Sequence, residues 1–408
     1  MNWRSTHRSL VRGVLLSLGF GACGGGGDGA AVDLPYEGVA YPAKLPPIVL
    51  PRAPYAFVTD GGADTLTVVD LSARRAVGAV PIGLYALDRD GPRHLAFDPA
   101  GGQLFVAMAY PRPPGAPGSH AAHVGGTAFG KVVRLGLPDF EPRGVVSVGQ
   151  GPGDLVLGRG GSRLVITHFD LETARDPDPD QREAEVYVFD DASGLTEASV
   201  PRIVRPCVAP QGVALAGPGA ERAWLACYGD DRIVALDLEQ PGAPVVVSLD
   251  LGPSPAQPGV PRFGPYAATL SPAGDRMLVG TIETERALVE VDLAAATLKT
   301  VYRSEGAVFF PAYAPDGGAA FVPTQAPDRV LKIDTATGEV LAERSFTSAE
   351  CLRPRQAAFV DLLGEPWVLC EGDSRGPGVA LALDPVTLET RAAVATGVAP
   401  DRFVVVQP

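Results

Sequence analysis

A repeated unit runs through most of the 408 residues and constrains the fold more than any other feature of the sequence. One copy reads Tyr55-Ala-Phe-Val-Thr-Asp60, then Thr65-Leu-Thr-Val-Val-Asp70 after a turn, then Arg75-Ala-Val-Gly-Ala-Val80. Each run is short, rich in β-branched residues and bounded by turn residues, which is typical of β-strands. The unit is therefore a small sheet, and repeats of this size build propellers or solenoids.

The second run of the unit recurs as a short strand that ends in aspartate, in six copies that close at Asp70, Asp190, Asp237, Asp292, Asp334 and Asp384. The corresponding run Arg134-Leu135-Gly136 lacks the aspartate. An aspartate at the end of a strand accepts backbone N–H bonds and holds the turn that follows. We therefore interpret this series of carboxylates as structural.

Counting the copies gives seven units of about 40–60 residues, which is the size of a propeller blade. The first unit lacks its opening strand, and Pro400–Val406 at the end of the chain supplies one. The sequence thus predicts an all-β fold, a seven-bladed β-propeller with four antiparallel strands per blade. The C-terminal strand closes blade one, which removes an open sheet edge.

Tyr55–Asp70 together with Val80-Pro-Ile-Gly83 resembles the YVTN-family β-propeller repeat. The superfamily that this resemblance implies also holds lactonase-like propellers and the propeller subunits of quinoprotein amine dehydrogenases. The likeness extends over about residues 50–408. It implies the fold and carries little about activity, because one fold hosts many functions.

The N-terminus is predicted to be a lipoprotein signal peptide, residues 1–22. A basic segment is followed by the apolar run Val14–Phe20 and then by Gly21-Ala22-Cys23. This order resembles the bacterial lipoprotein signal, in which the cysteine is diacylated, although Phe20 stands where leucine is usual. The alternative is an ordinary secretory signal followed by an unrelated cysteine.

Residues 23–51 are predicted to be a lipidated flexible tether, rich in Gly and Pro, and residues 52–408 the propeller. We expect the protein to be anchored to the bacterial cell envelope through lipid on Cys23. Gly24 after this cysteine favours the outer membrane. The formal net charge of −13 repels polyanions, so no nucleic-acid partner is expected.

The other four cysteines form two pairs of similar spacing, Cys207 with Cys227 and Cys351 with Cys370. In an exported chain an even number of cysteines indicates disulfides. The propeller topology places the members of each pair on one face, so we predict two disulfides, each within a single blade. A metal–thiolate site is the rival interpretation.

Four histidines are predicted to lie on that same face of adjacent blades. His94 starts the inner strand of blade two, His168 ends the second strand of blade three, and His120 and His123 lie in a long insertion between residues 110 and 130. An acidic loop follows His168. Imidazole with carboxylates suits Zn²⁺ or Cu²⁺, and the acidic run suits Ca²⁺, so a divalent metal is a candidate cofactor. The alternative is a set of solvated side chains.

Three arginines, Arg93, Arg355 and Arg402, begin the inner strands of blades two, seven and one, which adjoin around the ring. Their guanidinium groups are candidates to bind a carboxylate or phosphate ligand. The alternative is structural ion pairing with the nearby carboxylates of Asp60, Glu371 and Asp401. The aromatic residues Tyr266, Phe309 and Phe310 are expected to pack on the opposite side of the channel.

The sequence contains no Walker loop, no G-x-S-x-G motif, no recognisable Ser/His/Asp order and no C-x-x-C-H haem site, and no catalytic residue is assigned. These observations favour a cell-envelope lipoprotein whose propeller is a binding scaffold for a protein, glycan or small molecule. The alternatives are a lactonase-like or quinoprotein-type enzyme and a metal-binding accessory protein.

Overall fold

The computed structural model describes residues 48–84, 90–109, 129–253 and 260–407. The predicted signal peptide, the lipidation site at Cys23 and most of the tether lie outside these residues, as do His120 and His123. The chain divides into two compact units, and the second, Ala40–Pro408, holds every strand given below. Within the described ranges, no helix has both the length and the apolar character needed to cross a membrane.

Blades one to four each contain four antiparallel strands, with the inner strand given first. Blade one has β29 (Pro400–Val406), β1 (Tyr55–Asp60), β2 (Thr65–Asp70) and β3 (Arg75–Pro81). Blade two has β4 (Pro92–Asp98), β5 (Gln103–Met108), β6 (Phe129–Gly136) and β7 (Pro142–Gln150). Blade three has β8 (Pro152–Gly158), β9 (Arg163–His168), β10 (Glu183–Phe189) and β11 (Arg202–Val208). Blade four has β12 (Pro210–Ala216), β13 (Arg222–Cys227), β14 (Arg232–Asp237) and β15 (Val245–Asp250).

Blades five to seven repeat this order. Blade five has β16 (Thr269–Leu270), β17 (Arg276–Gly280), β18 (Ala287–Asp292) and β19 (Thr297–Arg303). Blade six has β22 (Ala319–Gln325), β23 (Arg329–Asp334) and β24 (Val340–Ser345), and its inner strand is split into β20 (Ala307–Val308) and β21 (Ala312–Tyr313). Blade seven has β25 (Pro354–Val360), β26 (Glu365–Cys370), β27 (Pro377–Leu383) and β28 (Thr390–Val398). In the described part of the chain, four short 3₁₀-helices lie in the loops: η2 (Arg159–Gly161), η3 (Thr173–Arg175), η4 (Pro179–Gln181) and η5 (Tyr228–Asp230).

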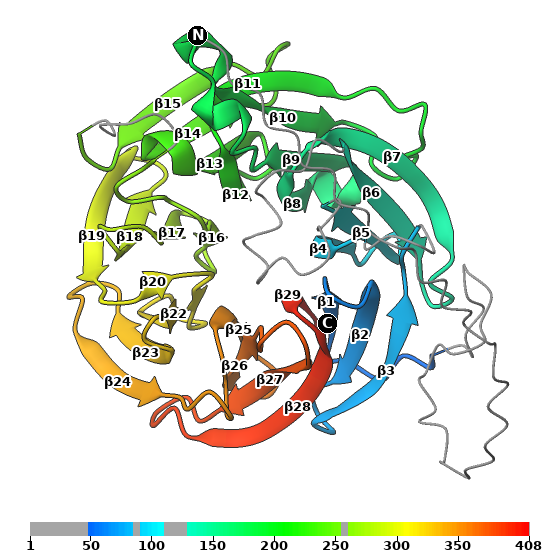
Figure 1. Cartoon of the computed structure of the whole chain (residues 1–408), viewed down its shortest axis with the longest axis vertical. Coiled ribbons are helices and arrows are strands. Elements are labelled where there is room, and N and C mark those ends of the chain that lie inside the picture. The colour runs from blue at the N-terminus through cyan, green and yellow to red at the C-terminus, as the bar shows by residue number, and fades with distance from the viewer. Residues whose placement is uncertain (1–47, 85–89, 110–128, 254–259, 408) are drawn as a thin grey trace, which may run out of the picture. The chain divides into compact units, whose positions relative to one another are not determined.

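The seven sheets are arranged in a ring, with the inner strand of each blade nearest its centre, as Figure 1 shows. The inner strand of each blade contacts the inner strand of the next, and β29 contacts both β25 of blade seven and β4 of blade two. β29 also pairs with β1 in antiparallel register, with Tyr55 opposite Val406. The predicted seven-bladed propeller, closed by the C-terminal strand in blade one, is therefore confirmed.

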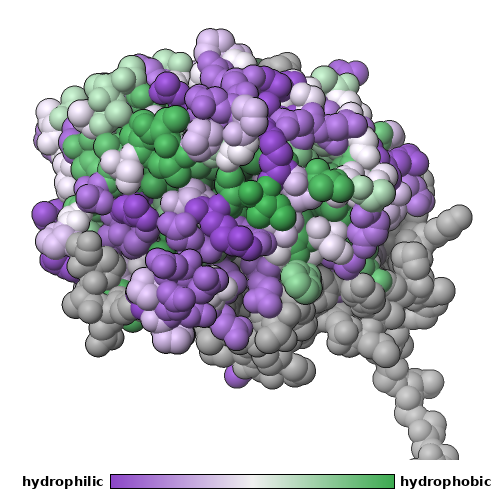
Figure 2. Space-filling view, turned by 90° about the horizontal axis from the view of Figure 1, so that it is seen from above, coloured by the Kyte–Doolittle hydropathy of each residue, from purple (hydrophilic) through white to green (hydrophobic). Residues whose placement is uncertain are grey.

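The hydrophobic core lies between successive blades. Phe57 of blade one and Leu104 of blade two belong to one buried cluster, and Trp224 of blade four packs with Met277 of blade five in another. Because each sheet is covered on both faces by its neighbours, a second strand such as β1 is buried along its whole length. The outer strands are more exposed, and Figure 2 shows polar groups beside apolar ones on one side of the molecule.

The aspartates that end the third strands hold turns, as predicted. Asp384 Oδ1 accepts the backbone N–H groups of Val386 and Thr387, both at 2.8 Å. These bonds lower the pKa of Asp384 to about 2. Asp190 differs, because its carboxylate pairs with Arg163 at 2.8 Å and Arg202 at 2.9 Å.

Both predicted disulfides are present in the structure. The prediction that each bond lies inside one blade was wrong for the first pair: Cys207 lies near the end of β11 in blade three, whereas Cys227 ends β13 in blade four. The reason is that β11, the outer strand of blade three, continues to Val208, almost to the start of β12 at Pro210. The Cys207–Cys227 bond therefore joins two neighbouring blades. Cys351 lies between β24 and β25, and Cys370 ends β26.

Candidate functional site

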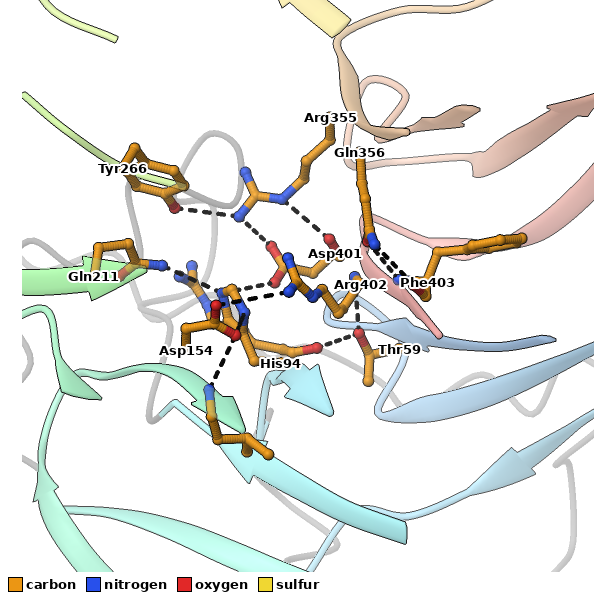
Figure 3. A network of polar contacts seen from close by, with 12 residues as sticks. Thr59, His94, Asp154, Gln211, Tyr266, Arg355, Gln356, Asp401, Arg402 and Phe403 are labelled. Carbon is orange, nitrogen blue, oxygen red and sulfur yellow. Dashed lines mark hydrogen bonds and ion pairs between the residues drawn. The ribbon is translucent and has the colours of Figure 1, made fainter. Parts of the chain in front are cut away.

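Every inner strand carries one extra residue close to its start, next to the centre of the ring of blades. We call this central region, into which the inner strands direct their side chains, the channel. In blade two, Pro92 pairs with Met108 and Leu95 with Val106, so two residues stand opposite one. The same irregularity occurs in the other six blades. A bulge of this kind turns side chains out of the regular pleat, and here it brings the channel-facing residues together. They are Arg93, His94, Asp154, Gln211, Tyr266, Phe309, Phe310, Arg355, Asp401 and Arg402. Figure 3 shows seven of them together: His94, Asp154, Gln211, Tyr266, Arg355, Asp401 and Arg402.

His94 lies at the centre of this cluster and is fully buried. Its Nδ1 atom is 2.8 Å from Oδ1 of Asp154, and its Nε2 atom is 3.2 Å from Nε2 of Gln211. A carboxylate only accepts, so Nδ1 carries the proton and donates to Asp154. Nε2 then keeps its lone pair and accepts a hydrogen bond from the amide of Gln211.

Two carboxylates flank the imidazole of His94. Asp401 Oδ2 lies 3.6 Å from Nε2, on the side opposite Asp154. Burial tends to raise the pKa of Asp154, but Arg402 and His94 outweigh it and hold that pKa below the usual value. Asp154 is therefore ionised at neutral pH, and a proton taken up by Nε2 would be stabilised from both sides of the ring.

Arg355 is held by two buried carboxylates and one phenol. Its guanidinium group lies 2.8 Å from Oε1 of Glu371, 2.6 Å from Oδ1 of Asp401 and 3.2 Å from the hydroxyl of Tyr266. Burial opposes the charge, yet Asp401, Tyr266 and Glu371 raise the pKa of Arg355 above its usual value. Arg355 is thus a fixed cation, and its predicted ion pairing with Glu371 and Asp401 is observed.

Arg402 is the most accessible of the three arginines, with a side chain that is 17% exposed. Its guanidinium carbon lies 4.2 Å from the ring centroid of Phe310, and Nη2 lies 3.6 Å from Oδ2 of Asp154. The backbone N–H of Arg402 donates to Oγ1 of Thr59 at 3.0 Å, and this threonine hydroxyl also donates to the carbonyl of Arg93. Stacking on an aromatic ring leaves the N–H donors of Arg402 available to a ligand.

The three arginines predicted as a cluster are therefore brought to one place, although only Arg402 has exposed side-chain surface of note. Arg93 is buried, and burial lowers its pKa. Asp60, expected among their partners, instead accepts hydrogen bonds from Thr65, Thr67 and the backbone of Gly397. It lies opposite Pro400, one residue away from the bulge.

The predicted opposite position of the aromatic residues was wrong. Tyr266, Phe309 and Phe310 surround the guanidinium of Arg355, with ring centroids 5.8, 5.7 and 5.9 Å from its carbon. Their rings make this part of the channel apolar between the charged groups, which strengthens electrostatic interactions inside it.

The backbone before the opening prolines is also unusual. The preceding residue has a positive φ in six blades, and in three of them it is not glycine: Ala209 (47°), Arg353 (56°) and Ala399 (49°). Non-glycine residues rarely adopt this conformation, which costs about 1–2 kcal/mol each. Strain of this kind concentrates at functional sites, so it marks this end of the channel.

His168 is not part of this centre. It lies between blades two and three, where Nδ1 is 2.7 Å from the carbonyl oxygen of Glu185 and the ring is 4.7 Å from that of Tyr187. Among the described residues, the group of His, Cys, Asp and Glu side chains close enough to share a metal ion is Cys207, Cys227 and Asp230. The two sulfurs of that group are bonded to each other, so they are not thiolate ligands. With His120 and His123 outside the described residues, the four-histidine metal site stays a prediction.

Sequence reasoning did not identify Asp154, Gln211 or Tyr266 as site residues. The signal was present, because each follows one of the prolines that open the inner strands within two positions. If the residues that follow these prolines had been considered as one set, most residues of the central cluster would have been predicted.

Comparison with solved structures finds the same fold in many proteins. A candidate 6-phosphogluconolactonase from Bacteroides uniformis is 10% identical with a TM-score of 0.61, covering 86% of this chain and 99% of that chain. The periplasmic gluconolactonase PpgL from Pseudomonas aeruginosa is 17% identical with a TM-score of 0.60, covering 87% and 99%. Hydrazine synthase from Kuenenia stuttgartiensis is 17% identical with a TM-score of 0.55, covering 78% and 91%.

No protein-family model matches the sequence, and a search of curated proteins finds no match. At these identities the structural neighbours establish the fold alone. They agree with the resemblance that the repeat suggested. The chain therefore has a seven-bladed β-propeller fold, which it shares with these structures.

Proposed function

We propose that the chain is a hydrolase of the lactonase type, which opens a small cyclic ester at the centre of the propeller. The observation that carries this proposal is the hydrogen bond between His94 Nδ1 and Asp154 Oδ1 at 2.8 Å. It fixes the imidazole in the tautomer whose Nε2 lone pair points into the cluster. An imidazole oriented by a carboxylate in this way is a competent general base.

In the proposed reaction, Nε2 of His94 exchanges its hydrogen bond from Gln211 for one from water. It then takes a proton from that water as the water oxygen bonds to the ester carbonyl carbon. Asp154 and Asp401 stabilise the imidazolium that results. Arg402 donates hydrogen bonds to the oxyanion of the tetrahedral intermediate. When the ring C–O bond breaks, the imidazolium returns its proton to the leaving alkoxide, and the product is a hydroxy acid.

The charges of the centre suit that product. A hydroxy acid carries a new carboxylate, and guanidinium groups bind carboxylates through paired N–H donors. Two structural neighbours described as a gluconolactonase and a candidate 6-phosphogluconolactonase act on lactones by their names, which supports this substrate class. We therefore expect a polar lactone with several hydroxyl groups.

The test is a rate assay in which the full mature chain is mixed with each of a panel of five- and six-membered sugar lactones. Ring opening is measured by the acid that it releases. We expect ring opening above the spontaneous rate. Changing Arg402→Gln should lower the rate by about 10²-fold, because the oxyanion loses a charged donor. The matched control is Arg375→Gln, an exposed residue in the loop before β27, which should leave the rate unchanged. Equal rates for wild type and Arg402→Gln would contradict the proposal.

A second candidate is the binding scaffold expected from the sequence. Arg402 is partly exposed and is held against the ring of Phe310, and a cation fixed in this way can bind a carboxylate without turnover. The two candidates separate in one experiment. A scaffold binds the hydroxy acid and leaves lactones intact, whereas a hydrolase consumes them.

We also propose that the protein works in the cell envelope, attached through lipid on Cys23. The basic and apolar segments before this cysteine support export, and the two disulfides suit an oxidising compartment. Membrane fractionation of cells that express wild type or Cys23→Ser tests it. Wild type should follow the membrane fraction and the variant should be released, and equal distribution would contradict lipid anchoring.

A further inference from the structure

A pocket away from the centre of the propeller lies between blades two and three. Its volume is about 530 Å³, which is within the range of small-molecule sites. It is lined by Phe129 and Gln150 of blade two and by the loop and strands around His168 in blade three. Five carboxylates line it, together with one guanidinium group, that of Arg205: Asp170, Asp176, Asp180, Glu183 and Glu185. The pocket therefore carries net negative charge.

His168 lines this pocket and is only 1% exposed. Its Nδ1 atom faces the carbonyl oxygen of Glu185, so Nδ1 carries the proton and Nε2 has a lone pair. Among the described residues, Nε2 of His168 has no hydrogen-bond partner. An unsatisfied buried acceptor costs about 1–3 kcal/mol, and a ligand that donates a hydrogen bond would recover this.

Gly149 of β7 leaves room beside this nitrogen. A Cβ atom at that position would lie 3.0 Å from Nε2 of His168 and 3.1 Å from Oε2 of Glu185. Any other residue would press on both atoms. Glycine at position 149 therefore leaves space beside both Nε2 of His168 and the carboxylate of Glu185.

The carboxylates of the pocket differ in how far they are already used. Asp170 accepts hydrogen bonds from the backbone of Glu172 and Thr173, and Glu185 pairs with Arg205 and with the hydroxyl of Tyr187. Asp180 and Glu183 are exposed, and among the described residues neither side chain has a hydrogen-bond or ion-pair partner. These two are the carboxylates most available to a bound cation.

We propose that this pocket binds an organic cation, a molecule with one or more primary ammonium groups. An ammonium group donates three hydrogen bonds and accepts none, which matches a lone acceptor nitrogen among carboxylates. Burial lowers the pKa of His168 to about 4, so the ring stays neutral and does not repel a cation at neutral pH. A metal ion fits less well, because among the described residues no three of these ligand atoms lie close enough together to share one.

The test is calorimetric titration of the full mature chain with 1,4-diaminobutane at low salt. We expect saturable binding of the diamine and none of 1,4-butanediol, which has the same chain length without charge. The double variant Asp180→Asn/Glu183→Gln should bind about tenfold more weakly. Both residues are exposed, so these changes do not disturb the packing around His168.

Glu172→Gln is the matched control, because Glu172 is an exposed carboxylate of the same loop that does not line the pocket. It should bind the diamine as wild type does. Equal affinity of wild type and the double variant, absence of diamine binding, or tight binding of Ca²⁺ or Zn²⁺ in place of the diamine would each overturn the proposal. The Arg402→Gln variant should retain diamine binding, so this result is independent of lactone hydrolysis.

Discussion

His94 and Asp154 come from different blades, yet Nδ1 of the histidine lies 2.8 Å from Oδ1 of the aspartate and both side chains are almost wholly buried. β4 and β8 are neighbouring inner strands, and the bulge in each strand turns one of the two residues into the channel. The contact thus depends on the closed ring as well as on the local sequence. It links the packing of the propeller to the chemistry proposed for its centre.

Changing Asp154→Asn should lower the free energy of unfolding by ~3–5 kcal/mol, because Arg402 and His94 lose the buried carboxylate that they share. Urea denaturation at neutral pH measures this. The control Glu172→Gln, at an exposed site, should stay within about 0.5 kcal/mol of wild type. Equal midpoints for wild type and Asp154→Asn would show that the carboxylate contributes nothing to the fold.

The Cys207–Cys227 bond should stabilise the contact between blades three and four. The double variant Cys207→Ser/Cys227→Ser is expected to lose ~3 kcal/mol of unfolding free energy, since the bond closes a loop of 20 residues. Urea denaturation without reductant compares it with wild type. Peptide mapping without reduction should recover Cys207 with Cys227 and Cys351 with Cys370, and free thiols at these positions would refute the pairing.

Asp60 should make the stability of the propeller depend on pH. Burial raises the pKa of Asp60 to about 7, against the opposing hydrogen bonds from Thr67, Thr65 and Gly397. A raised pKa means that the folded state holds the proton more tightly than the unfolded chain. The stabilisation from this group is therefore complete below its ordinary pKa and is lost as the pH rises through about 7.

The variant Asp60→Asn removes this titration and keeps the shape of the side chain. Its stability relative to wild type should increase by roughly 2–3 kcal/mol between about pH 5 and about pH 8. Urea midpoints of both proteins at the two pH values give the difference. Parallel changes in the two proteins would mean that Asp60 titrates as it does in water.

Much of the fold could be predicted from the sequence because each copy of the repeat is formed by residues that are close together in the chain. Short strands, turn aspartates and the missing first strand are all properties of neighbouring residues, and together they predicted seven blades and the closure by Pro400–Val406. The place of Cys207 was not accessible in the same way. Where β11 ends depends on pairing with β10, whose register shifts between Ala184 and Val186.

The candidate site was accessible only in part. The starts of the inner strands were recognised as one face, so the arginine cluster was predicted. The direction of each side chain depends on the bulges, which the sequence pattern did not reveal. His94 and His168 were therefore expected together, although one faces the channel and the other lines a pocket between blades.

The rate of lactone hydrolysis by the variant His94→Gln tests the central claim most directly. Glutamine keeps a polar side chain in the cluster but is not a base at neutral pH. We expect wild type to open a sugar lactone. The kcat of His94→Gln should be lower by about 10²–10⁴-fold, with KM little changed. A His94→Gln protein that is folded and hydrolyses the lactone as fast as wild type would contradict it.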